Sequence, residues 1–181
     1  MDFFYNVISS DFDIIGITES WLNGSISSGE LFSNKYNVFR RDRETSKSVK
    51  IDGGGASLAV KTSIPVTYHR ELLSDAEDVW ISVSDNTSRK VFICCVYLPG
   101  DDDYARTCFI SNLERNWQML HNHTVIIMGD FNMPRVNWLK ILNQNYLEPN
   151  NVDNNSSSMI DLFSLCELLQ FNFLKNNLES R

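Results

Sequence analysis

Two segments of the sequence place polar side chains directly after a run of apolar residues. In the first, the apolar run 125–128 continues into Gly-Asp-Phe-Asn at 129–132. The rim of a sheet is rigid but open to solvent, so Asp130 could take a proton from water there while Asn132 donates a hydrogen bond to a developing oxyanion. The alternative for the same four residues is a structural turn that caps the strand.

The second segment, 13–21, delivers Glu19 at the end of another apolar strand. Mg²⁺ is usually held by one or two carboxylates, with water and substrate phosphate completing its shell. Glu19 is therefore a candidate metal ligand. The alternative is a glutamate at a strand terminus that binds nothing.

Strands are predicted where β-branched and aromatic residues cluster between turn signals. The predicted strands are 12–18, 36–40, 56–61, 79–83, 91–98 and 124–128.

Helical spacing of apolar residues predicts three helices. One lies within 3–8, and a longer one follows Asp101 to Asp103, whose carboxylates suit a helix start. The third is predicted to follow Ser158, because Ser158 and Asp161 have the spacing of a capping box. The apolar faces expected are Phe109, Leu113, Trp117 and Leu120 in the second helix, and Leu162, Phe163, Cys166 and Leu169 in the third.

Strands that are apolar on both faces and separated by helices favour an α/β sandwich, and the close spacing of the middle strands predicts antiparallel pairing. The sequence contains no internal repeat. The Asn-rich stretch 143–158 is expected to be a surface loop rather than a linker, so a single domain over 1–181 is predicted.

Composition limits the classes of function. The 181 residues carry 16 Lys and Arg against 23 Asp and Glu, a net charge of −7, and 43% are hydrophobic. This acidic balance weighs against a charge-driven nucleic-acid binder, but it does not exclude an enzyme whose carboxylates hold a cation. No membrane-spanning run or secretory signal is recognisable, so the protein is expected inside the cell, in nucleus or cytoplasm, and not secreted. The four cysteines are expected to be buried free thiols with no disulfide-linked partner.

Five blocks of sequence resemble one family when they are taken in order. They are DIIGITESWL at 13–22, YNVFRRDR at 36–43, GGGASLAV at 53–60, VYLP at 96–99, and GDFN at 129–132 with Trp138. These blocks resemble the endonuclease/exonuclease/phosphatase superfamily. Within it they are most similar to the apurinic/apyrimidinic-type endonuclease domain at the amino end of non-LTR retrotransposon polyproteins.

The resemblance implies a four-layered α/β sandwich that hydrolyses phosphodiesters in DNA with Mg²⁺ or Mn²⁺. The family's metal-binding glutamate falls on Glu19 and its phosphate-facing tyrosine on Tyr97. Its water-activating aspartate falls on Asp130, and its asparagine that stabilises the transition state falls on Asn132. A tyrosine that merely fills the core remains the alternative for Tyr97.

Two parts of the family pattern have no counterpart in these residues. The family has a first strand with an asparagine near the metal, and a late Ser-Asp-His block whose histidine contacts the phosphate; no Ser-Asp-His occurs here. The fold is therefore expected to be incomplete, lacking its first strand and its C-terminal strands, with impaired activity. None of the histidines present is well placed to substitute for the missing one. The sequence His-Asn-His at 121–123 lies about 16 Å from Asp130 by strand rise, and His69 is beside another strand.

A basic run could contact a DNA backbone, since guanidinium groups pair well with phosphate. It comprises Arg40, Arg41, Arg43, Lys47 and Lys50, and a solvated hairpin is the alternative. The function predicted is that of a retrotransposon DNA endonuclease domain. The alternatives are a non-catalytic remnant that is inert or binds nucleic acid or protein, and another superfamily branch such as a lipid phosphoesterase or a deadenylase. Oligomeric state is left open.

Overall fold

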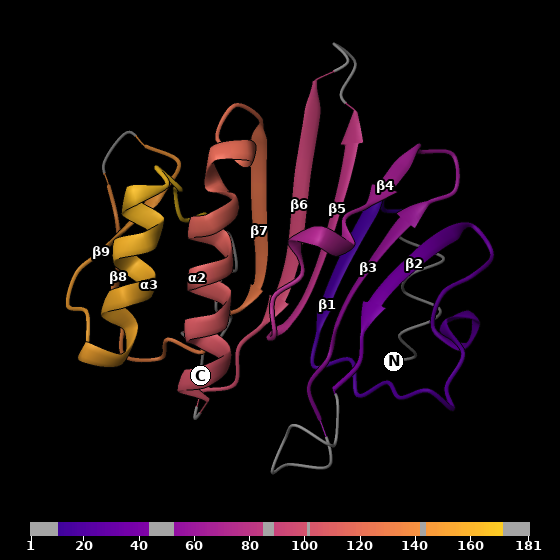
Figure 1. Ribbon diagram of the computed structural model, residues 1–181, viewed down its shortest axis with the longest axis horizontal. Helices are drawn as coiled ribbons and strands as arrows, with labels where there is room; N and C mark the ends of the chain where they lie inside the picture. Colours follow the sequence, from indigo (N-terminus) through magenta and orange to yellow (C-terminus); the bar gives the residue numbers. More distant parts are fainter. Residues whose placement is uncertain (1–10, 44–52, 85–88, 101, 142–143, 172–181) are drawn as a thin grey trace, which may run out of the picture. The chain divides into compact units, whose positions relative to one another are not determined.

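The computed structural model describes residues 11–43, 53–84, 89–100, 102–141 and 144–171 (Figure 1). The chain divides into two compact units, Met1–Asn132 and Met133–Arg181. The prediction of one domain over 1–181 stays a prediction. The helix expected within 3–8 lies outside the described residues, as do Lys47 and Lys50.

The first sheet of the first unit has three antiparallel strands in the order β1-β3-β2. They are β1 (Ile14–Thr18), β2 (Tyr36–Arg41) and β3 (Ala56–Lys61), and the 3-10 turn η1 (Ser28–Glu30) lies between β1 and β2. The central strand β3 is buried from Ala56 to Val60, which agrees with its uninterrupted run of small and branched residues. One short helical turn and one sheet are thus the regular structure of the described residues up to Lys61.

The second sheet has four strands in the order β4-β5-β6-β7. They are β4 (Val66–Tyr68), β5 (Glu77–Ser84), β6 (Lys90–Tyr97) and β7 (Thr124–Asp130), with the 3-10 turn η2 (Arg70–Leu72) after β4. β4, β5 and β6 pair antiparallel, whereas β6 and β7 are parallel. A parallel pair needs a crossover connection, and helix α2 (Asp103–Leu120) supplies it.

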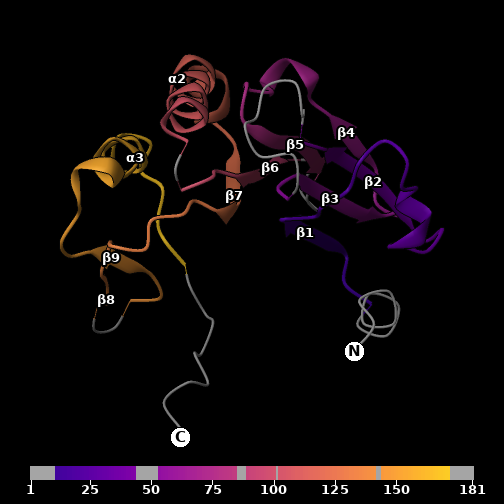
Figure 2. The same cartoon turned by 90° about the horizontal axis from the view of Figure 1, so that it is seen from below.

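The two sheets pack against each other across an apolar core. Its fully buried members come from β3, β5 and β6: Ala56, Leu58, Val60, Val79, Ile81, Ile93 and Cys95. Helix α2 covers the other face of the second sheet (Figure 2) and buries Phe109, Leu113 and Leu120. Its N-cap is Asp102, whose side chain accepts a hydrogen bond from the Ala105 amide at 2.9 Å.

The second unit contains a short antiparallel hairpin and a helix. These are β8 (Trp138–Lys140), β9 (Leu147–Pro149) and α3 (Asn154–Leu165). The expected loop at 143–158 and the expected helix start at Ser158 are wrong, because β9 and the first turn of α3 occupy part of that stretch. Asp153 is the actual N-cap and accepts hydrogen bonds from the Asn155 and Ser156 amides, so the cap lies five residues earlier than the predicted one.

The α/β class is confirmed, and every strand predicted from the sequence within the described residues is present, the one at 56–61 with its predicted bounds and the others with shifted ends. The short strands β4, β8 and β9 were missed. The cysteines are free thiols, but Cys108 on α2 is partly exposed and not buried as expected. None of the helices in the described part of the chain is long and apolar enough to cross a membrane.

Candidate active site

Strand register brings three polar side chains together at one rim of the second sheet. Tyr97 at the end of β6 pairs with Asp130 on the parallel strand β7. On its other side, Tyr97 pairs with Glu77 at the start of the antiparallel strand β5. Residues directly opposite each other on neighbouring strands share a face, so Glu77, Tyr97 and Asp130 form one row.

The turn after β7 fixes Asp130 and Asn132 relative to the end of β6. The Asn132 amide donates to Asp130 Oδ1 at 2.9 Å, and Asn132 Nδ2 donates to the Leu98 carbonyl oxygen at 2.7 Å. Asn132 has a φ of 48°, in the left-handed region that Asn tolerates better than most residues. An amide nitrogen has two N–H donors, so the second remains available to a ligand.

Glu19 follows β1 directly and is held by neighbouring donors. Its Oε2 accepts from Trp21 Nε1 at 2.8 Å and from the Gly54 amide at 3.0 Å. Glu19 itself has a φ of 53°, and Trp21 has a φ of 56°. Two left-handed non-glycine positions within three residues are uncommon, and such positions concentrate at functional sites.

Close packing of β1 on the second sheet brings Glu19 toward the rim that carries Tyr97. Cys95 Sγ lies 3.5 Å from the Ile17 carbonyl oxygen, to which it donates. A methyl group added at Gly16 would overlap the Sδ atom of Met128 on β7. A residue with a Cβ at this point of β1 would therefore require the Met128 side chain to move.

Tyr97 connects the two halves of the site, because its hydroxyl donates to the Glu19 carboxylate and accepts from the Arg43 guanidinium. Burial and the neighbouring Glu19 raise the pKa of Tyr97 to about 12, so its hydroxyl stays a neutral donor. Partial burial of Glu19 opposes its ionisation. The hydrogen bonds from Tyr97, Gly54 and Trp21 and the charge of Arg43 outweigh that effect and hold the pKa of Glu19 below its ordinary value.

Beneath these residues lies a glycine loop, Gly53–Gly55, which contacts two carboxylates with adjacent amides. Gly54 N–H donates to Glu19 and Gly55 N–H donates to Glu77, whose other oxygen binds Arg43 Nε at 2.7 Å. The loop has φ values of 89°, 76° and 87°, which explains the three glycines. Glu77 was not predicted from the sequence as part of this site. Pairing the residues of β5 and β6 outward from the turn between them would have placed Glu77 opposite Tyr97.

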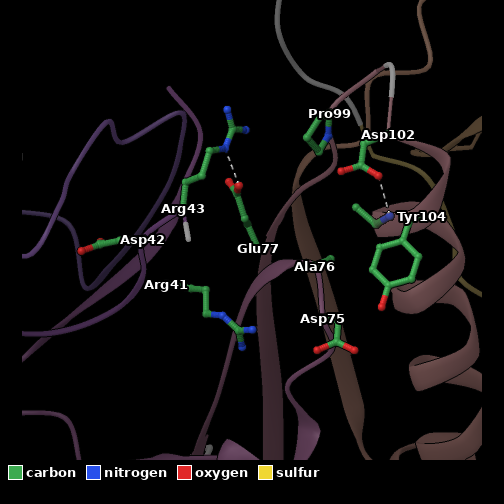
Figure 3. A pocket seen from close by; sticks show the side chains of 10 residues that line it. Arg41, Asp42, Arg43, Asp75, Ala76, Glu77, Pro99, Asp102 and Tyr104 are labelled. Atoms are coloured by element: carbon green, nitrogen blue, oxygen red, sulfur yellow. Dashed lines mark hydrogen bonds and ion pairs between the residues drawn. The ribbon is translucent and has the colours of Figure 1, made fainter. Parts of the chain in front are cut away.

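The three predicted DNA-backbone arginines occupy different environments. Arg40 is engaged within the chain, donating to the Asn23 and Ile26 carbonyl oxygens at 2.7 and 2.8 Å and pairing with Asp42 at 2.8 Å. Arg43 is bound to Glu77 and Tyr97. Arg41 lines a cavity of about 80 Å³ beside the Arg43–Glu77 pair (Figure 3), and the described residues offer its guanidinium no hydrogen bond or salt bridge. Their assignment as DNA contacts stays a prediction.

The predicted metal ligand Glu19 fits an open magnesium site rather than a cage made wholly of protein. In the described residues, no group of three or more His, Cys, Asp and Glu side chains is placed to hold a metal ion. Mg²⁺ does not require such a group, since one carboxylate with water and phosphate suffices. The Ser20 hydroxyl, buried next to Glu19 without a hydrogen-bond partner, is a further oxygen near this position.

None of the three histidines approaches the rim of Tyr97 and Asp130 through a contact in the described residues. His69 is buried between Glu71 and Ser82, with its ring nitrogens 2.6 and 2.8 Å from their oxygens. His121 follows α2 as its C-cap, and the ring of His123 packs on Phe92 at 5.3 Å. β7 begins at Thr124, so His123 lies at the opposite end of that strand from Asp130.

Comparison with known proteins shows which families this chain is similar to. The sequence family described as endonuclease-reverse transcriptase matches residues 91–179. The structure is similar to the endonuclease domain of TRAS1, a telomere-specific non-LTR retrotransposon, with a TM-score of 0.62 and 13% identity. That match covers 91% of this chain and 64% of the TRAS1 domain, so the chain spans less than two thirds of its relative.

Two further structures match over less of the chain. ANGEL2, a 2',3'-cyclic phosphatase, has a TM-score of 0.47 and 14% identity, over 72% of this chain and 42% of its own. The human Nocturnin catalytic domain has a TM-score of 0.43 and 15% identity, over 71% and 54%. No curated protein sequence matches significantly. The family match over residues 91–179 and the shared fold make the chain similar to retrotransposon endonucleases of the endonuclease/exonuclease/phosphatase superfamily.

Proposed function

We propose that the first unit is a metal-dependent phosphodiesterase that nicks DNA, as the endonuclease domain of a retrotransposon polyprotein would. The observation that carries the proposal is the position of Tyr97, whose hydroxyl interacts with Glu19 and which pairs in strand register with Asp130. This arrangement supports a single site made of the four residues that the family resemblance singled out from separate parts of the sequence. A core tyrosine and an isolated strand-end glutamate would not require this arrangement.

In the proposed reaction, Asp130 orients an attacking water and accepts its proton while the water oxygen bonds to phosphorus. The P–O bond to the departing strand breaks, and the departing oxygen takes up a proton from solvent. One oxygen of the Asp130 carboxylate accepts the hydrogen bond from the Asn132 backbone N–H, and the described residues leave the other oxygen without a hydrogen-bond partner. The free N–H of Asn132 Nδ2 and the neutral Tyr97 hydroxyl are donors for oxygens of the phosphate as negative charge builds up on them. Tyr97 suits this task because its raised pKa keeps the proton in place.

Glu19 would hold the cation, Mg²⁺ or Mn²⁺, which when bound supplies positive charge to neutralise the phosphate. The lowered pKa of Glu19 keeps its carboxylate ionised and ready to bind. The −7 net charge of the chain makes such a cation useful, because the protein surface alone repels a polyanion.

The test is nicking of supercoiled plasmid by the purified chain with Mg²⁺, with and without EDTA. Asp130→Ala should abolish Mg²⁺-dependent nicking, and Asp161→Ala, which removes an exposed aspartate of α3, serves as the matched control. Nicking that survives both EDTA and Asp130→Ala would contradict the proposal. A thermal melt of each variant shows whether a lost activity reflects a lost fold.

A second candidate is a DNA-binding module that does not cleave. The observation that favours it is the position of the histidines, since none in the described residues contacts Tyr97, Asp130 or Asn132. This candidate predicts Mg²⁺-dependent retention of a labelled duplex without nicked product. Nicked product that appears only with Mg²⁺ would exclude it.

A further inference from the structure

We propose that Glu77 and Arg43 form a positioning pair that sets the charge around Glu19 and thereby its affinity for a divalent cation. This inference rests on the proposed function, because it assigns a cation to Glu19. Neither residue is a ligand in the proposal. They act through the glycine loop and through Tyr97.

The pair is built into the site rather than lying on the surface. Arg43 Nε donates to Glu77 Oε1 at 2.7 Å, and the exposed fractions of the two side chains are 7% and 17%. A methyl group added at Gly54 would overlap both the Arg43 guanidinium and the Glu77 carboxylate. The middle of the glycine loop therefore lies directly on the ion pair, while its Gly54 N–H binds Glu19.

Two routes lead from the pair to Glu19. Through the backbone, Gly55 N–H donates to Glu77 and the adjacent Gly54 N–H donates to Glu19. Through side chains, Arg43 donates to the Tyr97 hydroxyl, which donates to Glu19, and the Arg43 Cζ atom lies 5.6 Å from the centroid of the Tyr97 ring. Figure 3 shows Arg43 and Glu77 facing each other, with Asp42 turned away from them.

The charges along this path alternate, and that determines what each substitution should do. Glu77 places a negative charge beside the Arg43 guanidinium, whose positive charge disfavours a cation at Glu19. Removing the Glu77 charge makes the surroundings of Glu19 less negative, so cation binding should weaken. Removing Arg43 leaves a second carboxylate near Glu19, so cation binding should tighten, although Tyr97 loses the donor that orients it.

The opposite signs distinguish this role from a purely structural one. If the pair only held the glycine loop in shape, both substitutions would loosen the loop and both would weaken cation binding. Groups that orient metal ligands typically change metal affinity by about 10- to 100-fold when they are substituted. We expect Glu77→Gln to raise the dissociation constant for Mg²⁺ about tenfold. Arg43→Met should lower it several-fold.

The measurement is a Mg²⁺ titration of the full chain without DNA, followed by the fluorescence of Trp21, whose indole N–H binds Glu19. Trp21→Phe identifies the Trp21 signal, and Glu19→Gln should abolish the response to Mg²⁺. Glu71→Gln is the matched control, since it neutralises a glutamate whose ion-pair partner is His69 and that contacts none of the site residues. It should leave the dissociation constant within about twofold of wild type.

Opposite shifts for Glu77→Gln and Arg43→Met, with the double variant close to wild type, support the inference. Shifts of the same sign, or none, overturn it while the wild-type response at Glu19 keeps the proposed function in place. A wild-type response that is absent, or that persists in Glu19→Gln, overturns both together. If Arg43→Met does not melt cooperatively, Arg43→Gln removes the same charge with a polar side chain and carries the same expectation.

Discussion

Asn132 offers a way to separate backbone strain from side-chain chemistry with two substitutions. It has a φ of 48°, and its side chain donates to the Leu98 carbonyl oxygen at 2.7 Å. Asn132→Ala removes that hydrogen bond and leaves a Cβ in the left-handed region. Asn132→Gly removes the same bond but accepts the backbone conformation without steric cost.

The expected losses of stability follow from these two terms. A typical hydrogen bond contributes about 1 kcal/mol net to folding, and a left-handed conformation costs an ordinary residue about 1–2 kcal/mol. Asn132→Ala should therefore lower the free energy of unfolding by about 2–3 kcal/mol, and Asn132→Gly by about 1 kcal/mol. Urea unfolding followed by tryptophan fluorescence measures both values.

Catalysis should not follow stability in this pair. If the Asn132 amide stabilises the transition state, both variants lose it equally, and loss of one such donor costs about 100- to 1,000-fold in rate. Mg²⁺-dependent plasmid nicking should therefore fall to a similar level in both, at a temperature where both are folded. A glycine variant that nicks at the wild-type rate would refute the catalytic role. Equal stability of the two variants would refute the argument from strain.

Three further predictions concern single positions. Gly129→Ala should destabilise the fold by more than about 2 kcal/mol, because the added methyl would overlap the Val96 carbonyl oxygen and Gly129 has a φ of 148°. Gly24→Ala is the control, since a methyl there meets open space, and chemical denaturation of both variants tests the prediction. The pKa of Tyr97 is raised from 10.0 to about 12. The contribution of Tyr97 to folding stability is therefore fully present below pH 10.0 and is lost as the pH rises toward 12. Subtracting the tyrosinate absorbance of the Tyr97→Phe variant from that of wild type isolates the signal of Tyr97. This difference should stay near zero at pH 10.0, and ionisation of half of Tyr97 at that pH would contradict the raised pKa. Arg40→Ala should lower the melting temperature and leave the nicking rate of the folded protein within about twofold of wild type, because its guanidinium binds the Asn23 and Ile26 carbonyl oxygens; a loss of DNA affinity with an unchanged melt would instead make it a DNA contact.

The strands were predictable because their burial produces long apolar runs. β3 is buried from Ala56 to Val60, and the sequence there is small and branched throughout. The short strands were not, since β4 has only three residues and is partly exposed, which leaves no periodic signal. The start of α3 was misplaced because Ser158 and Asp153 both offer a capping side chain, and only the backbone shows that Asp153 is used.

The site was predictable in its parts but not in its connections. Glu19 and Asp130 each end an apolar strand, and that pattern identified them. The bonds of Tyr97 to Glu19 and Arg43 depend on the packing of β1 against the second sheet, which no local pattern encodes. Glu77 escaped notice because a charged residue at the first position of a strand has no distinctive local signature.

The central claim is that Glu19 and Asp130, from two different sheets, act in one phosphodiesterase site. Single-turnover cleavage of a labelled DNA duplex with Mg²⁺ tests it most directly, using Glu19→Gln, Asp130→Asn and the double variant. Groups that act as a unit are strongly non-additive, so each single variant should lose about 100-fold or more, and the double variant should be little slower than the slower single. Losses that multiply in the double variant, or single variants that are folded and cleave at the wild-type rate, would contradict the claim.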